Sequence, residues 1–243
     1  MNPITTEAQI NIKSIQDWFS NSINSLDQFG EYEQLQLIIC AHELNFEHPN
    51  ITQKVEEIGV RGESNSMDYV FQYLEQIVMM KYNVGAHRQK HFFDYWVQKE
   101  NYVAQTEVTW AYIFGYLLME ENKLSTPELK QKAINWFKKV ESLKSISTTA
   151  WMVYYLDRNN EHEIAKKHLA ELKSWREANG SWSNFPSLTV RIAYPLALTR
   201  FANDESLKIT NEYILSQPWD SYSGDITYET GLIKWLNVHN HLS

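Results

Sequence analysis

Apolar and polar residues alternate along this chain with the period of an α-helix, in segments of two kinds. Segments of the first kind are amphipathic. In residues 126–144, Ala133, Trp136, Phe137 and Val140 recur at intervals of three and four residues, with lysines between them. This spacing places apolar side chains on one face of a helix. The same pattern predicts further amphipathic helices over residues 160–178 and 204–217.

Segments of the second kind are apolar and aromatic on most faces, and each begins at a threonine. Thr109, Thr149 and Thr189 follow one another at intervals of 40 residues, and a fourth copy begins at Thr227, 38 residues later. An earlier copy surrounds Tyr69. A helix that is apolar on most faces has to be buried, whereas an amphipathic helix can cover it. The pattern therefore predicts a helical hairpin repeated about every 40 residues, with the apolar helices inside.

The predicted fold is all-α, with residues 1–243 forming a single repeat domain. Glycine and proline are scarce, at 8 and 6 residues, which disfavours a β-sandwich or barrel with many tight turns. Residues 1–60 are interpreted as a degenerate capping hairpin, with helices over 10–26 and 31–44, and residues 61–243 as regular hairpins. Such hairpins build either an α/α toroid, complete or incomplete, or an open, curved α-solenoid.

The charge, the cysteine content and the lack of long apolar runs indicate which partners and which cellular compartment to expect. The net charge of −8 and the pI near 5.5, without a lysine- and arginine-rich stripe, disfavour binding to nucleic acid. The sequence has no basic segment followed by an apolar stretch at its start, and no apolar run of membrane-spanning length. Cys40, the single cysteine, lies in an apolar run and is expected to be a buried thiol. We therefore expect a cytoplasmic protein without a membrane partner.

Two junctions between helices carry a family resemblance. Residues 172–182 read LKSWREANGSW and residues 213–222 read YILSQPWDSY. They resemble the Gln/Trp-type repeat of the terpenoid cyclase and protein prenyltransferase α/α-toroid superfamily, over residues 106–236. In that superfamily an outer helix ends in a Gly-x-Trp-like turn and leads into an inner helix that begins near a threonine. The resemblance implies the shape of a toroid.

The catalytic motifs of that superfamily do not carry over to this chain. The Asp-x-Asp-Asp run of class II cyclases and the Cys-Gly-Glu-Gln run of thioester domains are absent. Prenyltransferases hold zinc with Asp, Cys and His, whereas Cys40 lies outside the matched region. The resemblance therefore implies a fold and no reaction, and no cofactor is predicted.

A ligand-binding cavity is the main site hypothesis. The positions two residues after each repeat threonine should be equivalent on successive inner helices, which makes Arg191 and Glu229 candidate neighbours. One interpretation is a charged pair inside an aromatic-lined cavity. The other is a structural ion pair that bridges two hairpins, with the aromatic side chains as ordinary core. The residues of the predicted cavity are Trp110, Trp151, Tyr154, Arg191, Tyr194 and Glu229.

Two groups of histidines have some features of a metal site, and neither predicts a bound metal. His87, His91 and Asp94 share one face of a predicted helix, but they equally suit a solvated outer face, and no cysteine or nearby glutamate completes the set. The pairs His-Glu at 42–43 and Glu-His at 47–48 place their histidines six residues apart. The H-E-x-x-H motif needs four, so this interpretation is rejected.

Two functional classes follow from these observations. The first is a binding protein that recognises a macromolecular partner through its helical-repeat surface, such as a toxin-neutralising immunity-type inhibitor. The alternative is a cyclase- or lyase-like α/α-toroid enzyme, acting on an apolar or cyclic substrate whose cationic intermediates the aromatic faces stabilise. The acidic charge and the missing reaction motifs favour the first class. The expected partner is accordingly another protein or a small apolar ligand.

Overall fold

The structure, a computed structural model, consists of helices and the turns that connect them over its described residues. These residues are 6–61, 69–85, 110–121, 123, 125–139, 145–217 and 225–242. No β-strand occurs within them. The prediction of an all-α fold is therefore confirmed.

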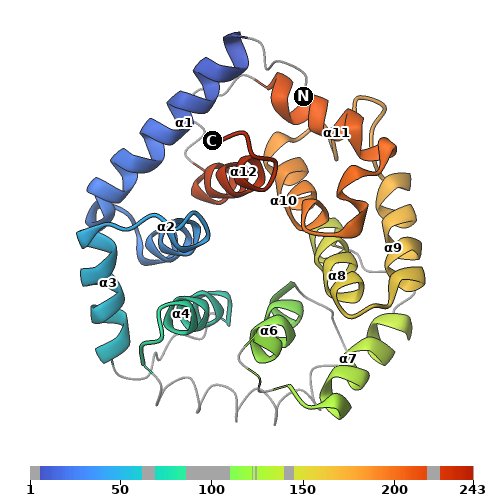
Figure 1. Cartoon of the computed structure of the whole chain (residues 1–243), viewed down its shortest axis with the longest axis horizontal. Helices are drawn as coiled ribbons and strands as arrows, with labels where there is room; N and C mark the ends of the chain where they lie inside the picture. Colours follow the sequence, from blue (N-terminus) through green and yellow to red (C-terminus); the bar gives the residue numbers. More distant parts are fainter. Residues whose placement is uncertain are drawn as a thin grey trace.

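The described helices lie in two concentric layers (Figure 1). The inner layer contains α2 (Glu31–Glu43), α4 (Tyr69–Lys81), α6 (Trp110–Glu121), α8 (Ile146–Arg158), α10 (Pro186–Ala197) and α12 (Ile226–Val238). The outer layer contains α1 (Thr6–Asn24), α3 (Pro49–Val60), α7 (Pro127–Lys139), α9 (His162–Ser174) and α11 (Glu205–Ser216). Short 3₁₀ helices, η1 (Leu26–Gln28) and η2 (Arg200–Asn203), lie in two of the connections.

The contacts of the inner helices form a closed cycle. Each helix packs against the next inner helix along the chain, from α2 to α12, and α12 packs against α2. Figure 1 shows the resulting ring, with α1 on the outside of this closing contact. Within the contact, the Cys40 thiol on α2 lies 3.7 Å from the carbonyl oxygen of Thr230 on α12. The space at the centre of the ring is therefore bounded by side chains from every described inner helix.

The two layers differ in burial as their sequences predict. Helix α9 buries Ala165, His168, Leu169 and Leu172, one stripe at helical spacing, and leaves its other faces in solvent. Helix α8 instead buries residues on most of its faces, from Thr148 to Leu156, because it lies between α9 and the neighbouring inner helices. Burial of apolar area of this kind contributes about 25 cal/mol per Å².

The amino-terminal region takes part in the ring. Helix α2 contacts α4 and α12, and therefore occupies an inner-layer position like those of the other inner helices. Helix α3, which the sequence analysis did not assign, begins with Pro49 at its first position, and the His48 side chain accepts a hydrogen bond from the Asn50 N–H. Proline is favoured at this position because its missing N–H has no partner within the helix. Helix α3 buries Ile51, Val55 and Ile58 on one face.

The turn between α9 and α10 is a tightly packed part of the outer layer. Trp182 is completely buried, and its indole N–H donates to the carbonyl of Leu172 at 2.9 Å. Its backbone N–H donates to Oγ1 of Thr189 at 3.1 Å. Gly180 has φ +92°, and its carbonyl accepts from the Thr210 hydroxyl at 2.8 Å. The turn therefore joins α9, α10 and α11 through one buried side chain and three hydrogen bonds.

Asp204 caps α11 and joins it to α9. Its carboxylate accepts from the N–H and the hydroxyl of Ser206 at 2.9 and 2.6 Å, and from Lys173 Nζ at 2.7 Å. The hydrogen bonds from Lys173 and then Ser206 lower the pKa of Asp204 from 3.8 to about 2.

Asp204→Ala is expected to lower the free energy of unfolding by about 1–2 kcal/mol at pH 7, measured by urea denaturation. Because the folded-state pKa lies below the unfolded value, this contribution is present above pH 3.8 and is lost as the pH falls towards 2. The difference between the parent and the variant should therefore narrow below about pH 4. Glu205→Ala, at a side chain that is 88% exposed, is the control and should cost less than about 0.5 kcal/mol. Equal losses in the two variants would contradict the capping role.

Candidate functional site

A cavity of about 420 Å³ lies at the centre of the ring. Residues from α2, α4, α6, α8, α10 and α12 line it. On α2 the lining residues are Tyr32, Gln36, Ile39 and Glu43, which recur every three or four residues and therefore share one face of the helix. The lining is mixed, with aliphatic, aromatic, hydroxyl and charged side chains. We call this space the central cavity.

Four of the predicted site residues line the central cavity: Trp151, Tyr154, Arg191 and Tyr194. They come from the adjacent helices α8 and α10. The Trp151 ring meets Tyr154 at a centroid distance of 5.8 Å and Tyr194 at 5.9 Å, both in edge-to-face geometry. These three rings form one aromatic wall. Such pairs stabilise each other by about 0.5–1.5 kcal/mol beyond the area they bury.

The other two predicted residues lie elsewhere. The side chain of Trp110 is outside the described residues. Glu229 is 3% exposed and does not belong to the lining. The lining face of α12 is formed by Thr227, Thr230, Gly231 and Lys234. At 100° per residue, Glu229 is turned about 150° from the middle of that face.

The carboxylate beside Arg191 belongs to Asp225, whose Oδ2 lies 3.5 Å from Arg191 Nη2. Asp225 also caps α12 by accepting from the N–H groups of Thr227 and Tyr228, and it accepts from the Ser187 hydroxyl at 2.8 Å. The ion pair of Arg191 therefore bridges two adjacent inner helices, α10 and the start of α12. The acidic partner of Arg191 therefore lies four residues, about one helical turn, before Glu229, the partner that the repeat spacing predicted.

A charged group at the cavity surface was missed by the sequence analysis. Lys81 Nζ lies 3.8 Å from Glu43 Oε1, and Lys234 Nζ lies 3.8 Å from Glu43 Oε2. The Tyr194 hydroxyl donates to Glu43 Oε2 at 2.7 Å, and Lys234 Nζ lies 4.8 Å from the Tyr194 ring centroid. These four residues, which we call the Glu43 cluster, come from α2, α4, α10 and α12.

Within the Glu43 cluster, burial determines the protonation of the Tyr194 hydroxyl. Tyr194 is 8% exposed, and burial, followed by the adjacent Glu43 carboxylate, raises the pKa of its hydroxyl well above 10. The hydroxyl therefore stays protonated at neutral pH and acts as a donor to Glu43. The cluster holds two ammonium groups and one carboxylate.

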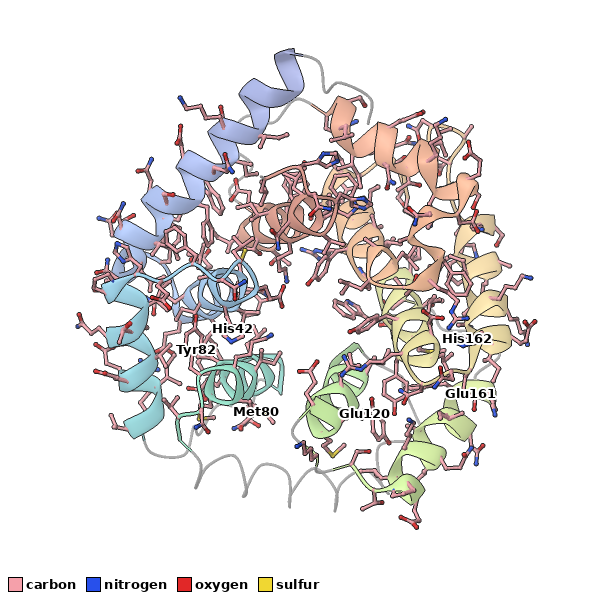
Figure 2. The ribbon with its side chains drawn as sticks, viewed as in Figure 1. His42, Met80, Tyr82, Glu120, Glu161 and His162 are labelled. Carbon is pink, nitrogen blue, oxygen red and sulfur yellow. The ribbon has the colours of Figure 1, made fainter. Side chains whose placement is uncertain are left out.

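A second charged group lies between α6 and α8. Arg158 Nη1 lies 3.1 Å from the Tyr154 hydroxyl and 3.4 Å from Glu121 Oε1, and Arg158 Nε lies 3.9 Å from Glu120 Oε2. Glu121 lines the cavity, and its side chain is 44% exposed. Figure 2 shows Glu120 on α6. The Arg158 side chain is 38% exposed. Because both Arg158 and Glu121 are exposed to this extent, solvent screens their ion pair, which adds little to stability.

Residues that suggested other chemistry have structural roles. Cys40 is completely buried, as expected, and burial raises the pKa of its thiol, which disfavours the nucleophilic thiolate. His42 Nε2 lies 3.1 Å from the Lys81 carbonyl oxygen, and the His42 ring packs against Tyr82 at 5.1 Å (Figure 2). His48 caps α3.

A metal site and a membrane-spanning helix are two further possibilities for the described residues. The candidate metal ligands His87, His91 and Asp94 lie outside them. Within the described ranges no cluster of His, Cys, Asp and Glu has the arrangement of a metal site. No helix in these ranges has both the length and the apolar character needed to cross a bilayer.

Comparisons with protein-family models, with curated proteins and with solved structures found no match to this chain. The resemblance to the α/α-toroid superfamily therefore stays a prediction from the sequence. The site must be interpreted from its own geometry, and that geometry describes a mixed aromatic and charged cavity at the centre of a ring of helices.

Proposed function

We propose that this protein binds a small amphipathic organic molecule in the central cavity. The observation that carries the proposal is the cavity itself, of about 420 Å³ and lined from every described inner helix. Ligand pockets typically measure roughly 300–1,000 Å³ and combine apolar walls with a few polar groups. Here the wall of Trp151, Tyr154 and Tyr194 supplies the apolar surface, and the Glu43 cluster supplies the polar groups.

The enzyme alternative predicted from the sequence receives less support from this geometry. A cyclisation through cationic intermediates needs aromatic faces that are free to stabilise positive charge. In the central cavity, Lys234 already lies over the Tyr194 ring, and Lys81 adds a second ammonium group. With one carboxylate between these two ammonium groups, the excess positive charge of the Glu43 cluster would disfavour a carbocation beside it. We therefore propose binding rather than cation-mediated cyclisation.

Recognition of a macromolecular partner, including the immunity-type function, stays a prediction that rests on the acidic charge. The exposed large apolar side chains of the described residues belong to separate elements, among them Val60 at the end of α3 and Phe185 before α10. Native mass spectrometry of the protein from its host would separate the classes, by the mass of a bound small molecule or of a second chain.

The uncharged dye N-phenyl-1-naphthylamine tests the proposal directly. We expect saturable binding of one dye per chain, measured by the dye's fluorescence. Ser147→Trp fills the cavity from the first turn of α8, where the backbone tolerates a larger side chain because Ser147 is only partly buried. This variant should raise the Kd by about tenfold or more, because little space is left for the rings.

Phe185→Ala is the matched control, because it removes an aromatic side chain that is 57% exposed and does not line the cavity. Dye binding should be unchanged in this variant. Circular dichroism and thermal unfolding establish that both variants fold. If Ser147→Trp binds the dye as tightly as the parent, or if Phe185→Ala loses binding, the central cavity is not the binding site.

A further inference from the structure

We infer that the central cavity selects organic anions, whose acidic group is bound by the ammonium groups of Lys81 and Lys234 while the apolar body packs against Trp151 and Tyr154. This inference rests on the proposed function and specifies its ligand class. The ligand would be a carboxylate or sulfonate attached to an aromatic or aliphatic body.

The ammonium groups of the Glu43 cluster retain unused hydrogen-bonding capacity. Each ammonium carries three donors, and each lies 3.8 Å from its nearest Glu43 oxygen, beyond the usual hydrogen-bond range of 2.7–3.2 Å. Neither ammonium donates a hydrogen bond within the part of the chain that the structure describes. The side chains of Lys81 and Lys234 are 22% and 15% exposed. Partly buried donors of this kind gain most from an acceptor that carries negative charge.

The charge balance of the lining points to the same position. Arg191 is balanced by Asp225 at 3.5 Å, and the guanidinium of Arg158 faces two carboxylates, those of Glu120 and Glu121, which leaves one excess negative charge in that group. In the Glu43 cluster, by contrast, two ammonium groups face one carboxylate, which leaves one excess positive charge. A bound carboxylate or sulfonate would neutralise this excess.

Glu43 lies between the two ammonium groups at the cavity surface. One of its oxygens faces Lys81, and the other faces Lys234 and accepts from the Tyr194 hydroxyl at 2.7 Å. Because the lysines come from α4 and α12 and Glu43 comes from α2 between them, the ring itself fixes their positions. A preorganised pair of donors binds an anion without a further cost of ordering the side chains.

The anion is recognised by these local groups and not by the overall field of the protein. The chain carries a net charge of −8, which repels anions at long range. Contacts within the cavity are screened less by salt than contacts at the surface. Selectivity should therefore depend on Lys81 and Lys234 and should be unaffected by lysines on the outer helices.

The test compares two dyes with the same aromatic rings. The anion 8-anilinonaphthalene-1-sulfonate carries a sulfonate that N-phenyl-1-naphthylamine lacks. We expect the sulfonate dye to bind the parent more tightly. Lys81→Met and Lys234→Met should each raise the Kd of the sulfonate dye about tenfold. The same substitutions should raise the Kd of the uncharged dye less than about twofold. Glu43→Gln should have the opposite effect, strengthening the sulfonate dye several-fold, because it removes the competing carboxylate.

Lys208→Met is the matched control, because Lys208 lies on α11 with its side chain 61% exposed, and it should change neither affinity. If neither dye binds the parent, the proposed function fails. If the uncharged dye binds in the cavity while the lysine variants weaken both dyes equally, or Glu43→Gln weakens the sulfonate dye, the inference fails and the proposed function stands. Competition by octanoate and by 1-naphthoate then distinguishes an aliphatic from an aromatic acid.

Discussion

Replacing Trp182 with alanine is expected to lower the free energy of unfolding by about 3–5 kcal/mol. The indole is completely buried, so its removal leaves a cavity that the surrounding helices can fill only in part. The substitution also removes the hydrogen bond from the indole N–H to the Leu172 carbonyl at 2.9 Å. Urea denaturation, followed by circular dichroism, measures the loss.

Two further variants separate the contributions at Trp182. Trp182→Phe keeps an aromatic ring but loses the N–H donor, and it should cost less than the alanine variant. Trp175→Ala is the matched control, because Trp175 lies at the end of α9 and is 37% exposed. It should cost less than about 1 kcal/mol, because a substitution at a partly exposed position creates no buried cavity. A loss at Trp182→Ala no larger than at Trp175→Ala would contradict the structural role of the buried indole.

The outer helices illustrate what helical periodicity can predict. Residues 160–178 and 204–217 were predicted as helices, and the structure has α9 at His162–Ser174 and α11 at Glu205–Ser216. The ends were predicted less well, because the predicted ends include capping and turn residues such as Asp204. Helix α3 was missed although Ile51, Val55 and Ile58 have the spacing of an amphipathic helix. Pro49 at its first position is a second signal of a helix start in the sequence.

The candidate site was predicted in part, and the error has a definite cause. Of the residues predicted for the cavity, Trp151 and Tyr154 on α8, and Arg191 and Tyr194 on α10, line one space. On α12 the predicted spacing of 38 residues led to Glu229. Continuing the spacing of 40 leads from Arg191 to Gly231 and from Tyr194 to Lys234, and both of these residues line the cavity.

The Glu43 cluster could not have been found from repeat spacing alone. Glu43 lies 151 residues before Tyr194, and the two meet only because α12 packs against α2 and closes the ring. The sequence pattern leaves that closure open, since an arc of hairpins buries the same stripes. One signal was present: Lys81 and Lys234 are charged residues in largely apolar inner segments, where a charge needs a partner or a water-filled space.

Gly180→Ala is expected to destabilise the protein by about 3 kcal/mol, although it adds a single methyl group. Gly180 has φ +92°, a conformation that residues with a Cβ rarely adopt. The added Cβ would also lie 2.4 Å from the carbonyl oxygen of Ile209 and 2.8 Å from the backbone nitrogen of Thr210. These are backbone atoms in the middle of α11, which cannot rotate away as a side chain can.

In the Gly180→Ala variant, the clash of the added Cβ with α11 can be relieved only if the turn moves away from α11. That movement would weaken the hydrogen bond from the Thr210 hydroxyl to the Gly180 carbonyl, now 2.8 Å long. Gly30→Ala is the control, since Gly30 has φ −62° and an added Cβ there would approach no atom more closely than 3.4 Å. It should cost less than about 1 kcal/mol in urea denaturation. Similar losses at the two glycines would mean that the contact between the turn and α11 yields easily, and that α11 is held to the ring chiefly by its apolar face.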